Sequence, residues 1–194
     1  MSNGKIIDIG WGKNSARQKR ADLIFSRIYP FLKNSRTIID IGCGDGLVSH
    51  LLQTKGKNVA SVDIADKSVI PKLNVIVYDG KTLPFPNRKF DTALLLTVLH
   101  HTPDPKIVFK EAVRVAKRII IIEDIYTNIF QKIFNVFFDS WQNKPLKFFW
   151  DSYKSDQEWK KFFKDNGFRA SDSNYYQDIP YLHGLYVLEK LSKS

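Results

Sequence analysis

The stretch Ile38-Ile39-Asp40-Ile41-Gly42-Cys43-Gly44-Asp45-Gly46-Leu47 decides the fold of this chain. A short β-branched run ends in a carboxylate, three glycines follow at alternate positions, and an apolar helical pattern begins after them. Glycine allows a tight turn and lets backbone N–H groups approach a ligand, and a helix N-terminus faces the same place. The stretch therefore predicts a buried strand, a ligand-binding turn and a helix.

The glycine spacing argues against two common nucleotide-binding turns. A dinucleotide-binding turn has the pattern G-x-G-x-x-G. Gly42 and Gly44 fit its first two positions, but Leu47 occupies the third and Gly46 comes one residue too early. A P-loop requires Gly-Lys followed by Ser or Thr, and no such residues follow here.

On both sides of this stretch, strand and helix patterns alternate. We predict strands over residues 37–41, 59–63, 75–79, 91–96, 119–122, 168–176 and 185–189, and helices over 14–29, 46–53, 103–117 and from Ser155 to Gly167. Ser155 and Glu158 have the spacing of a capping box. Because Ile119 to Ile122 show no alternation, we expect that strand to be buried on both faces of a parallel sheet. The pattern predicts an α/β fold with a doubly wound sheet.

Composition excludes several classes of protein and of site. The chain has 194 residues, 43% hydrophobic and 26% charged, which is typical of one globular core. Its single cysteine, Cys43, excludes an intramolecular disulfide and a cysteine metal cluster, and it favours a reducing, cytoplasmic setting. No histidine pair has a helical metal-binding spacing, so we expect no metal site. We also expect neither a signal peptide nor a bilayer-spanning segment.

The net charge of +10 leaves the kind of partner open. A nucleic acid or an anionic membrane surface would favour such a charge, but so would a basic surface with no partner. The positive side chains are densest in two short segments, which contain Lys13, Arg17, Lys19 and Arg20, and Lys160, Lys161 and Lys164.

Several motifs in order resemble those of a known enzyme family. Asp40 to Gly46 resembles the D-x-G-x-G-x-G first motif of class I S-adenosylmethionine-dependent methyltransferases. Ser61-Val62-Asp63 resembles the acidic end of their second strand. Tyr78-Asp79-Gly80, Leu83-Pro84-Phe85 and Phe90-Asp91 resemble the segment that leads into the fourth strand. Leu96 to His101 and Val113 to Lys117 resemble the type 11 subgroup, many of whose members act on small molecules. The resemblance covers about Arg36 to Lys190.

The resemblance implies a domain organisation. We expect a Rossmann-like doubly wound sheet, mostly parallel with an antiparallel last strand, and helices on both faces. Residues 1–35 would form an N-terminal helical cap, and residues 36–194 the methyltransferase domain with an aromatic lid at about 125–153. The protein would be a monomer or a homodimer.

The resemblance also implies S-adenosyl-L-methionine as cofactor, with S-adenosyl-L-homocysteine as product. Asp63 would accept the ribose hydroxyl protons, Asp79 the adenine amino group, and Asp40 would orient the glycine turn and the methionine amino group. The expected cofactor-binding residues are Asp40, Gly42, Cys43, Gly44, Gly46, Asp63, Ile64, Asp79, Gly80, Thr97 and Leu99. Independently, ligands of parallel sheets lie at the carboxyl ends of the strands, where these acids fall, although each acid alone could simply end a turn.

A general base is required only if the acceptor is a hydroxyl or an acidic carbon. His100 and His101 are the candidates, because imidazole titrates near neutral pH. Both could instead pack against the cofactor or cap a helix. Trp11, Arg17 and Arg20 of the first helix are candidate contacts over the cofactor.

Residues 125–153 are rich in aromatic side chains. Ile125, Ile129, Ile133 and Val136 share one helical face, which could pack on the sheet or form a lid over a hydrophobic acceptor. A basic, aromatic cover of this kind could also contact a membrane. We therefore expect a methyltransferase that acts on a small, hydrophobic acceptor. The alternatives are an RNA or DNA methyltransferase, which the charge favours, and a non-catalytic cofactor-binding partner protein.

Overall fold

The computed structural model describes residues 12–142, 150–178 and 181–191, except for the side chains of 12–15 and 138–142. Its helices are α1 Gly12–Ile28, α2 Leu47–Thr54, α3 Pro105–Val115, α4 Ile129–Gln142 and α5 Asp156–Asp165, with short 3₁₀ turns η1 Tyr29–Leu32, η2 Leu99–His101 and η3 Trp150–Ser152. Its strands are β1 Thr37–Ile41, β2 Asn58–Asp63, β3 Val75–Val77, β4 Phe90–Leu96, β5 Ala116–Ile125, β6 Phe168–Asp178 and β7 Tyr181–Lys190.

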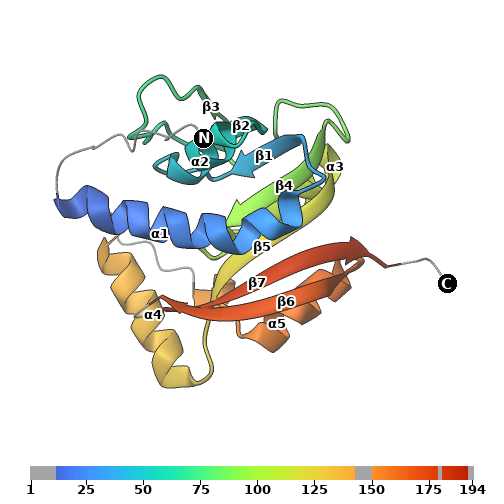
Figure 1. Ribbon diagram of the computed structural model, residues 1–194. Helices are drawn as coiled ribbons and strands as arrows, with labels where there is room; N and C mark the ends of the chain where they lie inside the picture. Colours follow the sequence, from blue (N-terminus) through green and yellow to red (C-terminus); the bar gives the residue numbers. More distant parts are fainter. Residues whose placement is uncertain (1–11, 143–149, 179–180, 192–194) are drawn as a thin grey trace.

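The strands form one sheet in the order β3-β2-β1-β4-β5-β7-β6 (Figure 1). Strands β1 to β5 pair in parallel, and β7 is antiparallel to both of its neighbours, β5 and β6. The expected mostly parallel sheet with an antiparallel last strand is confirmed. From β1 the sheet grows toward β2 and β3 on one side and toward β4 and β5 on the other. Ligands of such sheets bind at the carboxyl ends of the two strands where the order changes, here β1 and β4.

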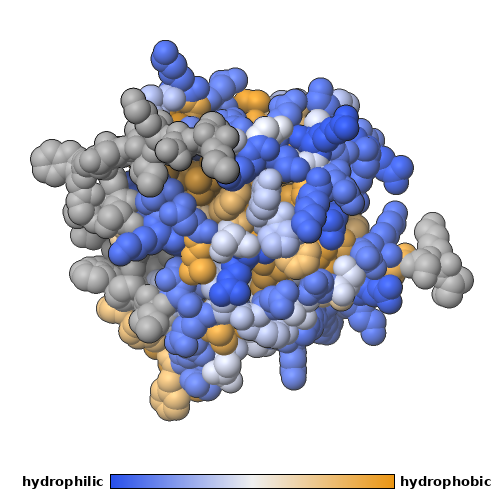
Figure 2. All heavy atoms as spheres, viewed as in Figure 1, coloured by the Kyte–Doolittle hydropathy of each residue, from blue (hydrophilic) through white to orange (hydrophobic). Residues whose placement is uncertain are grey.

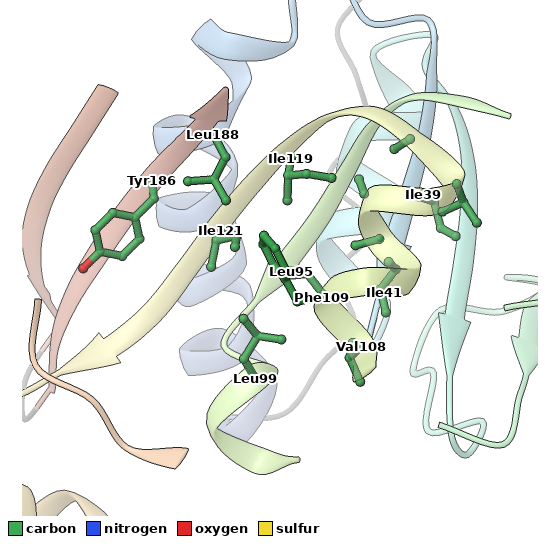
Figure 3. Close-up of a cluster of buried hydrophobic side chains, with 14 of the residues drawn as sticks. Ile39, Ile41, Leu95, Leu99, Val108, Phe109, Ile119, Ile121, Tyr186 and Leu188 are labelled. Atoms are coloured by element: carbon green, nitrogen blue, oxygen red, sulfur yellow. The ribbon is translucent and has the colours of Figure 1, made fainter. Parts of the chain in front are cut away.

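Two apolar layers cover the two faces of the sheet. On one face, Ile39, Leu95 and Ile121 belong to a cluster with side chains of α3 (Figure 3) and of α5. On the other face, Ile38, Leu94, Leu96, Ile120 and Ile122 pack against side chains of α1, η1 and α2. Alternate residues of β1, β4 and β5 thus point into different layers. The prediction that the strand with Ile119 to Ile122 is buried on both faces is confirmed, and this burial explains why the run has no polar residue.

Two predicted boundaries next to α3 are wrong. The helix ends at Val115 rather than at Lys117, because Ala116 is already extended and pairs with Phe90 of β4. The strand runs from Ala116 to Ile125 rather than only through the isoleucines. Its last residues, Asp124 and Ile125, pair with His183 and Leu182 of β7, a neighbour distant in sequence.

Helix α4 differs more from its prediction. Ile125 belongs to β5, and Ile129 and Ile133 are exposed while Val136 is buried, so these four residues do not form one packed stripe. Lys132 and Asn135 are buried instead. No helix in the described part of the chain is long and apolar enough to cross a membrane.

Candidate active site

The glycine turn after β1 is attached to the end of β2. The N–H groups of Gly42 and Cys43 donate to the carbonyl of Val62, at 2.7 and 3.0 Å. The N–H of Gly44 donates to Oδ2 of Asp63 at 2.8 Å. The first motif and the second acidic position, 19 residues apart, therefore meet at one edge of the sheet, as the sequence predicts.

The three glycines of the turn have different reasons to be glycine, although all have positive φ. A Cβ on Gly42 would lie 2.5 Å from a methyl group of Val98, and one on Gly46 would lie 2.3 Å from a methyl group of Leu73, so a side chain at either position would displace its neighbour. A Cβ on Gly44 would meet no atom within 4 Å. The backbone at Gly44 is therefore open to a ligand on that side.

Asp63 organises the start of the loop after β2. While Oδ2 binds the Gly44 N–H, Oδ1 accepts from the N–H of Ile64 at 2.7 Å. The Ile64 side chain is 65% exposed and lies beside Gly80, where an added Cβ would be 3.3 Å away from it. An exposed apolar side chain next to a carboxylate suits a ligand with both an apolar face and hydroxyl groups.

Asp40 lies beneath the turn and is buried. Its Oδ2 accepts from the hydroxyl of Ser49 in α2 at 2.6 Å, whereas Oδ1 has no partner. Burial raises the pKa of Asp40 to about 6, and the neighbouring carboxylates of Asp63 and Asp45 contribute to the increase. A buried carboxylate with an unpartnered oxygen favours a cationic or N–H-bearing ligand group. The role of Ser49 is not apparent from the sequence motifs.

The other expected cofactor residues have mixed environments. Asp79 is exposed, and its Oδ1 accepts from the N–H groups of Lys81 and Thr82, bonds that lower its pKa. It therefore ends a turn, and its adenine contact stays a prediction. Burial raises the pKa of Cys43, so its thiol stays protonated and is a poor nucleophile. The Leu99 side chain is fully buried in the core.

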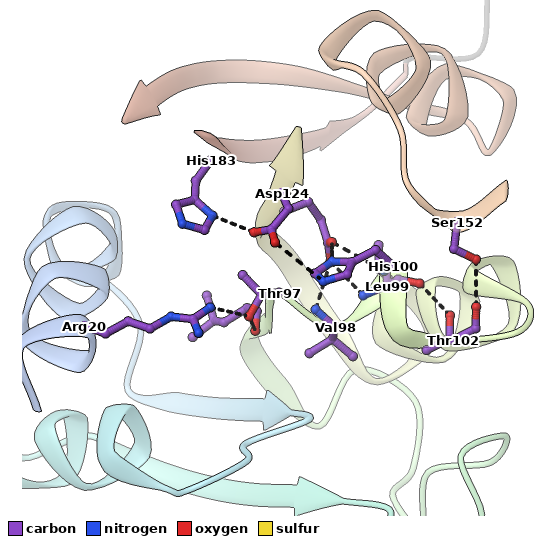
Figure 4. Close-up of polar contacts among 11 residues, drawn as sticks. Arg20, Thr97, Val98, Leu99, His100, Thr102, Asp124, Ser152 and His183 are labelled. Carbon is purple, nitrogen blue, oxygen red and sulfur yellow. Dashed lines mark hydrogen bonds and ion pairs between the residues drawn. The ribbon is translucent and has the colours of Figure 1, made fainter. Parts of the chain in front are cut away.

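The end of β4 is covered by α1. Thr97 has a φ of +57°, which is unusual for a residue with a branched side chain. Its N–H donates to the carbonyl of Ile122, and its Oγ1 accepts from Nη2 of Arg20 at 3.2 Å (Figure 4). This contact places Arg20, one of the two expected arginines, at the candidate site. Arg17 is exposed.

Glu123 of β5 fixes the backbone after β4. This fully buried carboxylate accepts from the N–H groups of Val98 and Leu99, at 3.0 and 2.7 Å, and contacts Nδ1 of His100 at 2.5 Å. The His100 Nε2 lies 3.8 Å from Oδ2 of Asp124, so the ring lies between two acids. Burial would raise the pKa of Asp124, but His100 and His183 together lower it to about 2.

The structure separates the two candidate bases. His100 is buried and held by Glu123, an arrangement that favours the packing interpretation. His101 is exposed, and its ring centre is 4.0 Å from that of His100. Desolvation and the neighbouring His100 lower the pKa of His101, so its imidazole is neutral at neutral pH. A neutral imidazole can accept a proton.

A hollow lies at the opposite edge of the sheet. It is lined by residues at the amino ends of β4, β5 and β6 and by their neighbours, among them Arg88, Lys117 and Lys190. Its position is remote from the glycine turn, so it is not part of the candidate active site. In the described part of the chain, no cluster of three potential metal ligands is present.

Comparison with known families agrees with this geometry. Residues 39–119, which contain the glycine turn, Asp63, Thr97 and η2, match the family model described as methyltransferase domain. This match covers less than half of the chain, and the sheet around it has the class I methyltransferase fold.

Curated relatives match less than half of this chain. A ubiquinone biosynthesis O-methyltransferase from Nitrosomonas europaea is 27% identical over 96 residues, which are 43% of this chain and 40% of that protein. The mitochondrial ubiquinone biosynthesis O-methyltransferase of Arabidopsis thaliana is 38% identical over 79 residues, 34% of this chain and 24% of the plant protein. The chain therefore matches at most about two fifths of the length of these relatives.

Solved structures extend the likeness of fold beyond the methyltransferase domain. An S-adenosylmethionine-dependent methyltransferase from Methanosarcina mazei has a TM-score of 0.67 at 21% identity, covering 86% of this chain and 98% of the other. Magnesium protoporphyrin IX methyltransferase from Synechocystis, solved with bound S-adenosylhomocysteine, has a TM-score of 0.66 at 16% identity, covering 98% and 90%. At these identities the likeness concerns the fold.

Proposed function

We propose that the protein transfers a methyl group from S-adenosylmethionine to a small, hydrophobic acceptor. The observation that carries this proposal is the meeting of Asp40, Gly44 and Asp63 at one sheet edge, with the Asp63–Gly44 hydrogen bond between them. The match of residues 39–119 to the methyltransferase family supports it.

The residues at this edge fit the cofactor. Open space beside Gly44 leaves room for a ligand against the backbone, and Asp63 keeps acceptor capacity for hydroxyl protons. The unpartnered Oδ1 of Asp40 suits an amino group, and the exposed Ile64 suits an apolar ring. When bound, S-adenosylmethionine supplies an electrophilic methyl group whose leaving group, a neutral thioether, requires no acid.

The protein's own contribution is then mainly alignment. Glu123 holds the backbone of Val98 and Leu99, and Arg20 holds Thr97, so the floor and cover beside the glycine turn are preorganised. Holding two reactants in line can contribute several kcal/mol, on the order of 7–11 in well-oriented systems. For a hydroxyl acceptor, we propose His101 rather than His100 as the general base, because His101 is exposed whereas His100 is buried against Glu123; the lowered pKa of His101, about 3, makes it a weak base.

The hydrophobic nature of the acceptor is proposed from α4. Ile129, Phe130, Ile133, Phe134 and Phe137 are 47–79% exposed (Figure 2, lower left, over α4 of Figure 1). Such a surface suits an apolar acceptor or the membrane from which it comes, and suits RNA less well. Together with the +10 charge, it supports peripheral contact with an anionic membrane. We further propose a cytoplasmic location, because the chain has a single cysteine and so does not rely on an intramolecular disulfide.

Two measurements test the proposal. Calorimetric titration with S-adenosylhomocysteine should show binding, and the labelled methyl group of S-adenosylmethionine should enter one member of a panel of alkylphenols, lipids and RNA. Labelling of an apolar small molecule supports the proposal. Salt-sensitive labelling of RNA instead would establish the nucleic-acid alternative. Cofactor binding with no transfer to any class would support a non-catalytic binding protein.

A further inference from the structure

Helix α4 buries polar side chains and exposes apolar ones. Lys132 and Asn135, three residues apart on one face, are 8% and 1% exposed, whereas Phe130 and Phe137 are 79% and 66% exposed. Neither Oδ1 nor Nδ2 of Asn135 has a hydrogen-bond partner. Burying an amide without partners is unfavourable. A helix that buries this polar pair rather than its phenylalanines indicates that the pair has a ligand to bind.

The Lys132 ammonium lies between aromatic rings. Its Nζ is 5.0 Å from the ring centre of Tyr126 and 4.8 Å from that of Trp150. Among the described residues, no carboxylate forms an ion pair with it. Glu158, whose pKa is lowered in part by the charge of Lys132, already accepts through Oε2 from the Tyr126 hydroxyl and from the N–H and hydroxyl of Ser155.

A second ammonium lies near the first. Lys154 is half-buried, and its Nζ donates to the carbonyl of Asp151 at 2.5 Å. Burial lowers its pKa, Glu158 opposes this, and the positive charge of Lys132 lowers it further. Asp151 and the buried Glu123 are the other acids that act on Lys154. Its Nζ is 5.6 Å from the ring of Trp159, whose indole N–H is also buried without a partner. This region therefore holds hydrogen-bond donors without acceptors, namely the Asn135 amide and the Trp159 indole N–H.

The donors are connected to the candidate active site through η3. Trp150, which contacts Lys132, begins η3, and Ser152 ends it. The Ser152 hydroxyl donates to the carbonyl of Thr102 at 2.9 Å (Figure 4), and the Tyr153 ring centre is 4.9 Å from that of His100. The donor group thus adjoins η2, which contains the candidate base His101.

We propose that Lys132, Asn135 and Lys154 form a subsite for an oxyanion, a carboxylate or a phosphate, carried by the apolar methyl acceptor. This inference rests on the proposed function and names the acceptor more closely as an anionic amphiphile. The ammonium groups supply the charge, and the Asn135 carboxamide supplies a directed N–H donor. Binding of the oxyanion satisfies polar groups that are unpartnered in the protein alone.

The test compares three probes that differ only in their head group: 4-octylbenzoate, 4-octylphenyl phosphate and the neutral 4-octylbenzamide. Each is titrated calorimetrically into the full chain saturated with S-adenosylhomocysteine. We expect at least one anion to bind about 10-fold more tightly than the amide, as expected for hydrogen bonds to a charged group. Lys132→Met should remove most of this preference and leave the affinity for the amide within about two-fold. Lys164→Met, an exposed change on α5 with the same loss of charge, should preserve the preference.

Asn135→Leu gives a second readout that a purely structural role would not produce. Removing an unpartnered buried amide should raise the melting temperature of the ligand-free protein, by about 2–4 °C. The same change should weaken anion binding. Equal binding of all three probes, binding of none, or a preference that survives Lys132→Met overturns the subsite while leaving the proposed function intact. Failure to bind S-adenosylhomocysteine would instead refute the proposed function.

Discussion

Asp63 is the side chain that joins the glycine turn to β2. Its carboxylate accepts backbone N–H groups from Gly44 and Ile64 and is expected to accept the ribose hydroxyls as well. Asp63→Ala should therefore weaken binding of S-adenosylhomocysteine by about 10- to 100-fold, as expected for hydrogen bonds to a charged group worth roughly 1.5–3 kcal/mol. Calorimetry measures the change. Asp66→Ala is the matched control, because within the described residues this exposed carboxylate of the same loop accepts only from the N–H of Ser68. Unchanged affinity in Asp63→Ala would remove Asp63 from the site.

Asp40 is expected to make the stability of the free protein depend on pH. Its folded-state pKa of about 6 lies above the ordinary value of 3.8, so folding favours the protonated form. The corresponding stabilisation is fully present below pH 3.8 and is lost as the pH rises through 6. Relative to Asp40→Asn, the wild type should lose about 2.4 kcal/mol of unfolding free energy between pH 4 and pH 7, at 1.36 kcal/mol per pKa unit.

Urea unfolding of both proteins across this pH range checks the Asp40 prediction. If the difference in unfolding free energy between the wild type and Asp40→Asn stayed the same at every pH, the Asp40 carboxylate would not be destabilised by burial. This pH dependence bears on ligand binding. Burial destabilises the charged form of Asp40 in the free protein, and a cationic ligand group placed beside the carboxylate would stabilise that form.

At the scale of elements, the sequence predicts the parts of the fold that local patterns determine. The bounds of β1 and the capping box of α5 agree with prediction, since each depends on residues within one segment. The ends of β5 differ because they depend on pairing with β4 and β7. The orientation of α4 could not be predicted from its apolar periodicity. The informative signal was the polar pair Lys132 and Asn135 at helical spacing within an aromatic segment.

The contribution of helix α1 to cofactor binding can be measured through one contact, between Arg20 and Thr97. The bond from Arg20 to Thr97 connects it to the end of β4, where Thr97 has a positive φ. Arg20→Ala should weaken binding of S-adenosylhomocysteine by about 2- to 5-fold, because the contact is exposed and a typical hydrogen bond contributes about 1 kcal/mol. Arg17→Ala removes an equal charge from the same helix and should have no effect. An equal loss in both variants would indicate general electrostatics rather than the contact with Thr97.

At the scale of the whole molecule, the site is a product of sheet topology. Asp40, Asp63 and Glu123 come from three strands, and they lie at the same edge of the sheet because β1, β2 and β5 run in parallel. The sequence places acids at strand ends, which was sufficient to predict the edge. It did not predict that Glu123 would bind the backbone after β4, because that bond requires both strands in register.

The surface of the whole molecule combines a net charge of +10 with the exposed apolar side chains of α4. In a vesicle flotation assay, we expect a fraction of the protein to bind vesicles of phosphatidylcholine and phosphatidylglycerol. This bound fraction should be smaller with vesicles of phosphatidylcholine alone, and smaller at high salt. Phe130→Glu, at a side chain that is 79% exposed, should reduce the bound fraction by about 3- to 10-fold, whereas Ile107→Glu on α3 should not. Because both positions are exposed, neither change should unfold the protein. If wild-type protein stays unbound and instead forms a dimer that Phe130→Glu dissociates, α4 contacts a second copy and not a membrane.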